Sequence, residues 1–284
     1  MFSRPTARRS LSRSASSQPP DQSLRKERVP IVVAVLASIG AAFFILPLLG
    51  LIVRSPWGDA VTALSAPETI EALKLSLIAS LSATAVGLLV GVPLAWIFAR
   101  VEFPGRDLLR ALTTLPMVLP PVVGGIALLL AFGRRGLVGS WLDSALGIRL
   151  PFTTAGVVMA ETFVAMPFLI ITVEAGLRSM DRRYEEAART LGAKRWTVFT
   201  RVTLPLIGPS LFAGAVLCWA RALGEFGATI TFAGNFPGVT QTMPLAVYLL
   251  LETNQEASYI LSLVLLVISL GVLVALRHRW LGSA

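Results

Sequence analysis

The chain has 284 residues, of which 55% are hydrophobic and only 14% are charged, and its mean hydropathy is +0.74. Because a soluble domain usually carries about 25% charged residues, this composition excludes an ordinary water-soluble fold and predicts an all-α integral membrane protein. The formal charge of +9 does not favour nucleic-acid binding, since the basic residues lie between apolar runs without interleaved aromatic side chains. One cysteine and one histidine exclude an intrachain disulfide and a His/Cys metal centre, and Cys218 is expected in the apolar core.

Residues 1–30 form a basic, Arg- and Ser-rich segment with few large apolar side chains, which predicts a disordered cytoplasmic tail. The Arg8-Arg9 pair resembles a twin-arginine signal, but the apolar run that follows begins too late and is too long for one. An organellar transit peptide is the alternative for this segment.

Six apolar stretches predict six transmembrane helices, because about 20 helical residues cross the hydrocarbon core of a bilayer. In chain order the spans are expected at 31–53, 70–99, 111–132, 152–173, 206–232 and 257–276. The apolar piece 243–251 is too short to span and is predicted as a re-entrant or interfacial helix. By domain, we expect a first helix with its outer loop over 31–68, a core over 69–277, and a cytoplasmic tail over 278–284.

The third predicted span is unusual because five helix-breaking residues fall inside it: Pro116, Pro120, Pro121, Gly124 and Gly125. At membrane depth, such residues are tolerated only where neighbouring protein or a cavity satisfies the freed backbone groups. The span is therefore expected to lie against other protein rather than against lipid alone.

The distribution of Lys and Arg predicts which side of the membrane each connection faces. Most of these residues lie in the N-terminal tail, in 100–110, in 178–201 and near the C-terminus. The remaining connections hold only Arg54, Arg134, Arg135 and Arg149. Because cytoplasmic connections carry the excess of Lys and Arg, both termini and the 178–205 loop are expected in the cytoplasm.

The segment 180–206, MDRRYEEAARTLGAKRWTVFTRVTLPL, is the longest densely charged stretch between apolar spans. Asp181 is expected to cap a helix over 182–191, and Gly192 stands where helices commonly end in a left-handed conformation. A second helix should follow, closed by Pro205. Its apolar residues are expected to share one face: Trp196, Val198, Phe199 and Val202.

The chain lacks the G-x-x-x-x-G-K-[ST] loop that binds nucleotide phosphates, since none of its three lysines follows the required glycines. The sole histidine, His278, lies at the C-terminal edge, so a Ser/His/Asp arrangement is also excluded. The chain is therefore predicted to be non-catalytic, without a cofactor, and any ATP must be hydrolysed by a partner.

Glu186-Ala187-Ala188, Gly192 three residues later, and Val202-Thr203-Leu204-Pro205 after nine more resemble the EAA motif, EAA-x3-G-x9-I-x-L-P, of binding-protein-dependent ABC importer permeases. Valine stands where isoleucine is usual. The resemblance implies a type I permease bundle of six helices that dimerises around one translocation path. It also implies that the 178–205 loop couples to a cytoplasmic ATPase through these residues: Glu185, Glu186, Ala187, Ala188, Gly192, Leu204 and Pro205.

A second resemblance concerns the substrate. Residues 220–230, ARALGEFGATI, and 235–248, NFPGVTQTMPLAVY, are similar to stretches of molybdate permeases. This implies molybdate import with an extracytoplasmic molybdate-binding protein. Sulfate/thiosulfate permeases share the R-A-x-G-E-F-G-A core and are the alternative, and tungstate is not distinguished from molybdate. An ATP-independent secondary transporter is the remaining alternative.

The broken third span and the fifth span are implied to line the path or to pack the helices around it. The candidate residues are Pro120, Pro121, Gly124, Gly125, Arg221, Gly224, Glu225, Gly227 and Thr229. Arg221 and Glu225 are four residues apart, so they are expected to pair along one helix and hold it in the bundle. Direct contact of Arg221 with an oxyanion is the alternative. Gly224 and Gly227 are expected to let helices approach closely.

Overall fold

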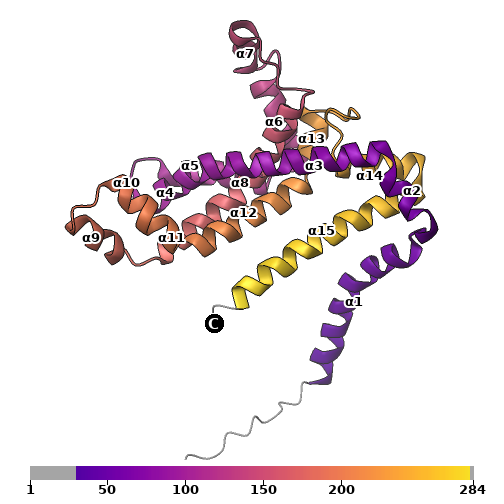
Figure 1. Cartoon of the computed structure of the whole chain (residues 1–284), viewed down its shortest axis with the longest axis horizontal. Helices are drawn as coiled ribbons and strands as arrows, with labels where there is room; N and C mark the ends of the chain where they lie inside the picture. The colour runs from indigo at the N-terminus through magenta and orange to yellow at the C-terminus, as the bar shows by residue number, and fades with distance from the viewer. Residues whose placement is uncertain (1–29, 282–284) are drawn as a thin grey trace, which may run out of the picture. The chain divides into compact units, whose positions relative to one another are not determined.

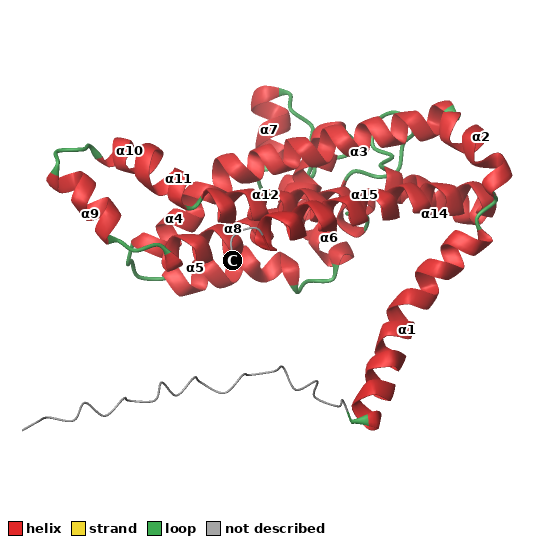
Figure 2. Cartoon of the chain, turned by 60° about the horizontal axis from the view of Figure 1, so that its bottom comes forward, coloured by secondary structure: helices red, strands yellow, loops and turns green. Residues whose placement is uncertain are grey.

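The structure, a computed structural model, describes residues 30–281, with side chains described as far as Val274. Every regular element in this range is helical (Figures 1 and 2), as the composition predicts. The chain divides into two compact units, residues 1–49 and 50–284. The predicted N-terminal tail, with its twin-arginine and transit-peptide alternatives, lies almost wholly outside the described residues.

Four continuous helices are long and apolar enough to cross a membrane. They are α1 (Ile31–Arg54), a 34-residue helix Pro67–Arg100, α8 (Thr154–Ser179) and α15 (Gln255–Leu281). The second of these comprises α3 (Pro67–Val86), a π-helical segment η2 (Gly87–Gly91) and α4 (Val92–Arg100). Two bent pairs of helices bring the number of candidate spans to six, which agrees with the predicted number.

The third predicted span is two helices rather than one. α5 (Arg106–Thr114) and the 3-10 turn η3 (Leu115–Met117) are followed by α6 (Pro121–Phe132), and the two parts meet at 118°. The prolines explain the break, because Pro120 stands at the N-cap of α6 and Pro121 starts it, where a missing N–H costs no helical hydrogen bond. The third predicted span is therefore broken at its prolines, as its helix-breaking residues predicted, although its first half begins at Arg106 rather than at residue 111.

The fifth predicted span is also interrupted, and the expectation of one helix over 206–232 is wrong. It consists of α12 (Gly208–Leu223) and α13 (Gly227–Phe232), separated by three residues. Before α12 come α10 (Arg195–Val198), a π-helical segment η4 (Phe199–Thr203) and α11 (Leu204–Leu206). Pro205 lies inside this run, and the chain bends by 74° only after Leu206, so Pro205 does not close the unit as expected.

The main core of the second unit is built around α8, which packs against α3, α4 and α12. In Figures 1 and 2 these helices run alongside one another. Fully buried side chains of this core include Phe98, Leu169, Leu177 and Cys218, so the expectation of a buried core cysteine is confirmed. A smaller core joins α6 to α13 and α8.

Shorter helices occupy connections that were expected to be loops: η1 (Trp57–Asp59), α2 (Ala60–Ser65) and α7 (Gly139–Leu146). α9 (Arg183–Thr190) lies in the charged 180–206 segment. The apolar piece expected over 243–251 is helix α14 (Met243–Thr253), which has 11 residues. α15 continues to Leu281, beyond its predicted end at residue 276.

Candidate functional site

The charged segment adopts the predicted helix–turn–helix geometry at its first helix. Asp181 Oδ1 accepts a hydrogen bond at 2.9 Å from the backbone N–H of Arg183, so it satisfies a free N–H of the first turn of α9 as expected, although the N-cap residue itself is Arg182. At the other end, Gly192 has φ +84° and donates to the carbonyl of Arg189, while Ala193 donates to the carbonyl of Ala188. These two bonds form a left-handed helix terminus that requires glycine at position 192.

The two adjacent glutamates of α9 point in opposite directions. Glu186 is exposed, whereas Glu185 is only 6% exposed. Glu185 Oε1 accepts from Thr203 Oγ1 at 2.8 Å, and its Oε2 lies 3.4 Å from Arg100 Nε. The resemblance placed Glu185 at the ATPase contact, but the structure turns it into the protein.

The other residues that the motif singles out lie at or near the surface. Ala187, Gly192 and Pro205 are exposed, while Ala188 and Leu204 are half-buried. Both views place α9 and α10 together at one end of the second unit, beside α4 and α5 (Figures 1 and 2). The basic connections 100–110 and 178–201 therefore meet at the same end.

Three large apolar or aromatic side chains project from this segment. Leu191 is 88% exposed, Trp196 is 73% exposed and Tyr184 is also exposed. The single apolar face expected for the second helix is wrong for Trp196, because Val198 is buried whereas Trp196 points outward. The sequence analysis did not identify Leu191 and Tyr184 as surface residues, although the charged residues on either side of them in the sequence indicate an exposed segment. Exposed aromatic and apolar groups among charges are typical of a protein-binding surface.

The second candidate region is the interruption between α12 and α13. Arg221 Nη2 lies 2.6 Å from Glu225 Oε2, so the predicted pairing is confirmed. The pair does not lie along one helix, because α12 ends at Leu223. Glu225 is 1% exposed, and its other oxygen accepts from the backbone N–H of Ala228 at 2.8 Å. Both carboxylate oxygens of Glu225 are therefore used to hold the break together.

Two buried polar groups near this break lack a hydrogen-bond partner among the described residues. They are Oε2 of Glu161, in α8, and Oγ1 of Thr229, in α13. Glu161 is 1% exposed. Buried polar groups nearly always have a hydrogen-bond partner, so these two atoms could still form hydrogen bonds between α8 and α13.

Glycines allow α6 and α13 to approach closely. A Cβ atom at Gly125 would lie 2.6 Å from Thr231 Cβ, and one at Gly227 would lie 2.7 Å from Pro121 Cβ. Gly124 contacts Phe163 less tightly. Gly224 differs, because it is exposed and the nearest atom to its Cβ position is the carbonyl oxygen of Ala220 at 3.7 Å, so it brings no two helices together within the described part of one copy. Pro120 is also exposed.

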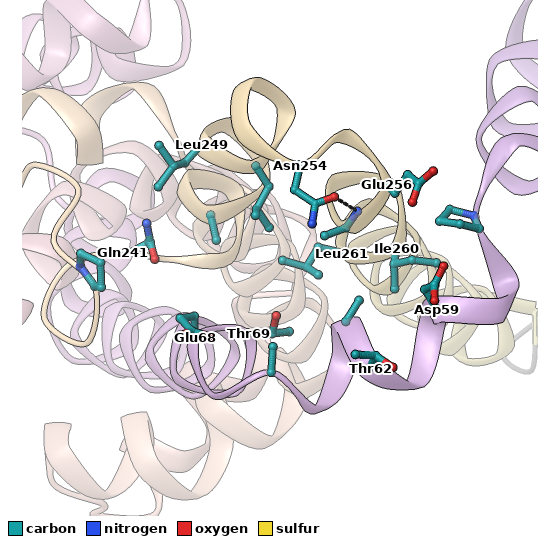
Figure 3. Close-up of a pocket in the computed structure, with 17 residues that line it drawn as sticks. Asp59, Thr62, Glu68, Thr69, Gln241, Leu249, Asn254, Glu256, Ile260 and Leu261 are labelled. Atoms are coloured by element: carbon teal, nitrogen blue, oxygen red, sulfur yellow. Dashed lines mark hydrogen bonds between the residues drawn. The ribbon is translucent and has the colours of Figure 1, made fainter.

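A cavity of about 560 Å³ lies between α2, the start of α3, α14 and the start of α15 (Figure 3). Asp59, Glu68 and Glu256 line it, together with the amide side chains of Gln241 and Asn254, and no Lys or Arg does so. Figures 1 and 2 place α2 and α14 at the end of the second unit away from α9 and α10. No group of His, Cys, Asp and Glu side chains suited to a metal ion occurs among the described residues.

Comparison with known proteins identifies a family. Residues 87–284 match the family described as binding-protein-dependent transport system inner membrane component. The molybdenum transport system permease protein ModB of Mycobacterium tuberculosis is 45% identical over 251 residues, which cover 88% of this chain and 95% of that protein. ModB of Escherichia coli is 43% identical, with 75% of this chain and 93% of that protein covered.

A more distant relative is the sulfate transport system permease protein CysT of Escherichia coli, which is 36% identical over 82% of this chain and 85% of that protein. Among solved structures, a bacterial ABC transporter that imports alginate matches with a TM-score of 0.67 and 21% identity. That match covers 88% of this chain and 94% of the alginate transporter chain. The chain therefore belongs to the family of binding-protein-dependent transport system inner membrane components and is a multi-pass permease of the type I ABC importers.

Proposed function

We propose that this permease imports molybdate. The observation that carries the proposal is the identity of 43–45% to the ModB permeases over most of the chain, against 36% to the sulfate permease CysT. The α12–α13 interruption, with its Arg221–Glu225 pair, falls in the 220–230 stretch that resembles molybdate permeases. The substrate would be a tetrahedral oxyanion delivered by a separate molybdate-binding protein on the opposite side of the membrane from the ATPase.

Import would be driven by a cytoplasmic ATPase that binds the exposed surface of α9 and α10. This surface offers Glu186 for charged contacts and Tyr184, Leu191 and Trp196 for apolar contacts. Aromatic residues at the centre of a contact commonly carry much of its binding free energy. The clustering of the basic connections at this end supports the inference that it faces the cytoplasm.

The translocation path would form between two copies of the chain. The described cavity of about 560 Å³ lies at the α2–α14 end and not beside α6 and α13. α6 exposes a row of apolar side chains, among them Val122, Ile126 and Leu130. A second copy packed against this exposed face of α6 would complete the path.

We infer that Arg221 holds the α12–α13 break in place rather than binding the oxyanion. Its guanidinium is 2.6 Å from Glu225, whose side chain is 1% exposed, so much of its charge is already paired. A strongly held anion would also leave the path slowly. Selection of molybdate would then belong mainly to the binding protein.

The test is uptake into proteoliposomes that contain the permease, its cognate ATPase and its cognate binding protein. We expect ATP-dependent uptake of labelled molybdate, competition by tungstate, and little competition by an equal concentration of sulfate. Uptake that prefers sulfate would refute the molybdate assignment and favour the CysT-like alternative. Uptake that persists without ATP would instead indicate a secondary transporter.

A further inference from the structure

Glu185 lies at a junction of three elements that are distant in sequence. It belongs to α9, while Arg100 ends α4 and Thr203 ends η4. The side chains of Arg100 and Glu185 are each 7% exposed, and Thr203 is 1% exposed. The carboxylate of Glu185 thus fixes both halves of the coupling loop to the end of the second span.

The last turn of α4 makes further contacts with cations on either side. The carbonyl of Ala99 accepts from Arg182, just before α9, at 3.4 Å. The carbonyl of Phe98 accepts from Arg110, in α5, at 3.1 Å, and the same guanidinium lies 5.5 Å from the centre of the Phe98 ring. Helix C-terminal carbonyls carry partial negative charge, which favours these contacts.

Arg110 also connects this junction to α8. Its Nη2 atom lies 2.8 Å from Glu174 Oε1, and Arg178 Nη2 lies 2.7 Å from the same oxygen. Glu174 is 6% exposed. The end of α4 is therefore bonded on one side to the coupling loop and on the other to α5, the first half of the broken third span.

The Arg100–Glu185 contact leaves hydrogen-bond donors of the Arg100 guanidinium without a partner among the described residues. Arg100 Nε and Nη2 are buried without a hydrogen bond to any described residue, and the 3.4 Å separation from Glu185 is long for a charge-assisted bond. A bidentate contact with the Glu185 carboxylate would satisfy both nitrogens. Packed interfaces tend to switch between discrete arrangements, and the unused donors of Arg100 could be satisfied in a second arrangement of this contact.

We propose that Glu185 is a positioning residue that transmits movement of the coupling loop, through Arg100 and the end of α4, to α5 and the broken third span. Its role is distinct from that of exposed Glu186, which is proposed to contact the ATPase. The proposal rests on the proposed coupling of this loop to an ATPase, because without that partner the loop has no movement to transmit.

The experiment uses the permease reconstituted with its ATPase and binding protein, and compares Glu185→Gln, Arg100→Gln and Thr203→Val. Glu102→Gln is the matched control, because Glu102 is exposed two residues beyond Arg100. For Glu185→Gln and Arg100→Gln we expect normal copurification of the ATPase and retained ATP hydrolysis, but at least a tenfold loss of molybdate transported per ATP. Thr203→Val should show a smaller loss, and the Arg100→Gln/Glu185→Gln double variant should be no worse than either single one.

A second readout separates transmission from general stability. In a Cys218→Ala background, single cysteines at Leu108 in α5 and at Arg189 in α9, both exposed, report thiol-labelling rates with and without ATP and vanadate. We expect ATP to change both rates in the parent protein but only the rate at position 189 in Glu185→Gln. The exchanged pair Arg100→Glu/Glu185→Arg should regain part of the coupling.

Loss of ATPase copurification in Glu185→Gln, in proportion to lost uptake, would make Glu185 a contact residue and overturn the proposal. Wild-type transport per ATP in Glu185→Gln, or an unchanged ATP response at position 108, would overturn it as well. If the parent complex itself neither binds an ATPase nor responds to ATP, the proposed function fails. That outcome is recognised before any variant is compared.

Discussion

The close approach of α6 and α13 gives the sharpest test of the packing. In Gly125→Ala, the new Cβ atom would lie 2.6 Å from Thr231 Cβ and 2.9 Å from the carbonyl oxygen of Ala228. Neither neighbour is the end of a flexible side chain, so one helix must move away from the other. Overpacking of this kind costs about 1–3 kcal/mol in a well-packed core. At roughly 2–4 °C per kcal/mol for a chain of this size, the melting temperature should fall by about 2–12 °C.

The single cysteine provides the assay. Cys218 is fully buried in the main core, away from Gly125, so a thiol-reactive dye reports unfolding of the detergent-solubilised protein at a native position. Gly271→Ala is the control, since no atom lies within 4 Å of its Cβ position in α15. This control should melt with the wild type or slightly above it, because alanine favours helix by about 1 kcal/mol over glycine.

Adding Thr231→Ala to Gly125→Ala should not restore stability, because the Cβ atom of residue 231 and the Ala228 carbonyl both stay in place. Equal melting of Gly125→Ala and the wild type, measured at the same scan rate, would refute the close packing of α6 on α13. Rescue by Thr231→Ala would show that the side chain of Thr231, and not the backbone, limits the approach.

Three further predictions concern other parts of the chain. Gly192→Ala should lower ATPase copurification, because a φ of +84° strains any L-residue by about 1–2 kcal/mol, even though no atom lies within 4 Å of the new Cβ. Gly192→Pro should lower copurification further, since proline also removes the hydrogen bond from the N–H of residue 192 to the carbonyl of Arg189. Ser76→Ala should lower the melting temperature more than Ser262→Ala. Ser76 Oγ accepts a hydrogen bond from the buried N–H of Met243 at 2.7 Å, and leaving that donor without a partner costs about 1–3 kcal/mol. Ser262, the control, only donates to a carbonyl of its own helix. Hydrogen bonds from Arg149 and Arg134 lower the pKa of Asp143 from its ordinary value of 3.8, so the contribution of these bonds is present above that pH and is lost only as the pH falls below it. Asp143→Asn should therefore speed trypsin cleavage after Arg134 and Arg149 already at neutral pH, and unchanged cleavage would contradict these ion pairs.

The number of spans was predictable because apolar length and helix breakers are local properties of the sequence. The prolines at positions 120 and 121 indicated a break in the third span, but a proline does not fix the angle of a break, which is 118° here in a helix that also packs against α13. The break in the fifth span had no proline to announce it. At this break Glu225 lies beyond the end of α12, forms an ion pair with Arg221 and accepts a hydrogen bond from a backbone N–H in the first turn of α13.

The 178–205 loop shows which structural features the local sequence pattern cannot predict. Its motif predicted a capped helix, a glycine turn and a charged surface, because each depends on neighbours within a few residues. It could not separate Glu185 from Glu186, since both are acidic residues in the first turn of α9. What separates them is Arg100, which precedes Glu185 by 85 positions in the chain and comes near it only when α4 and α9 meet. The same helix therefore exposes one carboxylate and keeps the other for the bundle, and under the proposed coupling a force applied at Glu186 would reach Arg100 through Glu185.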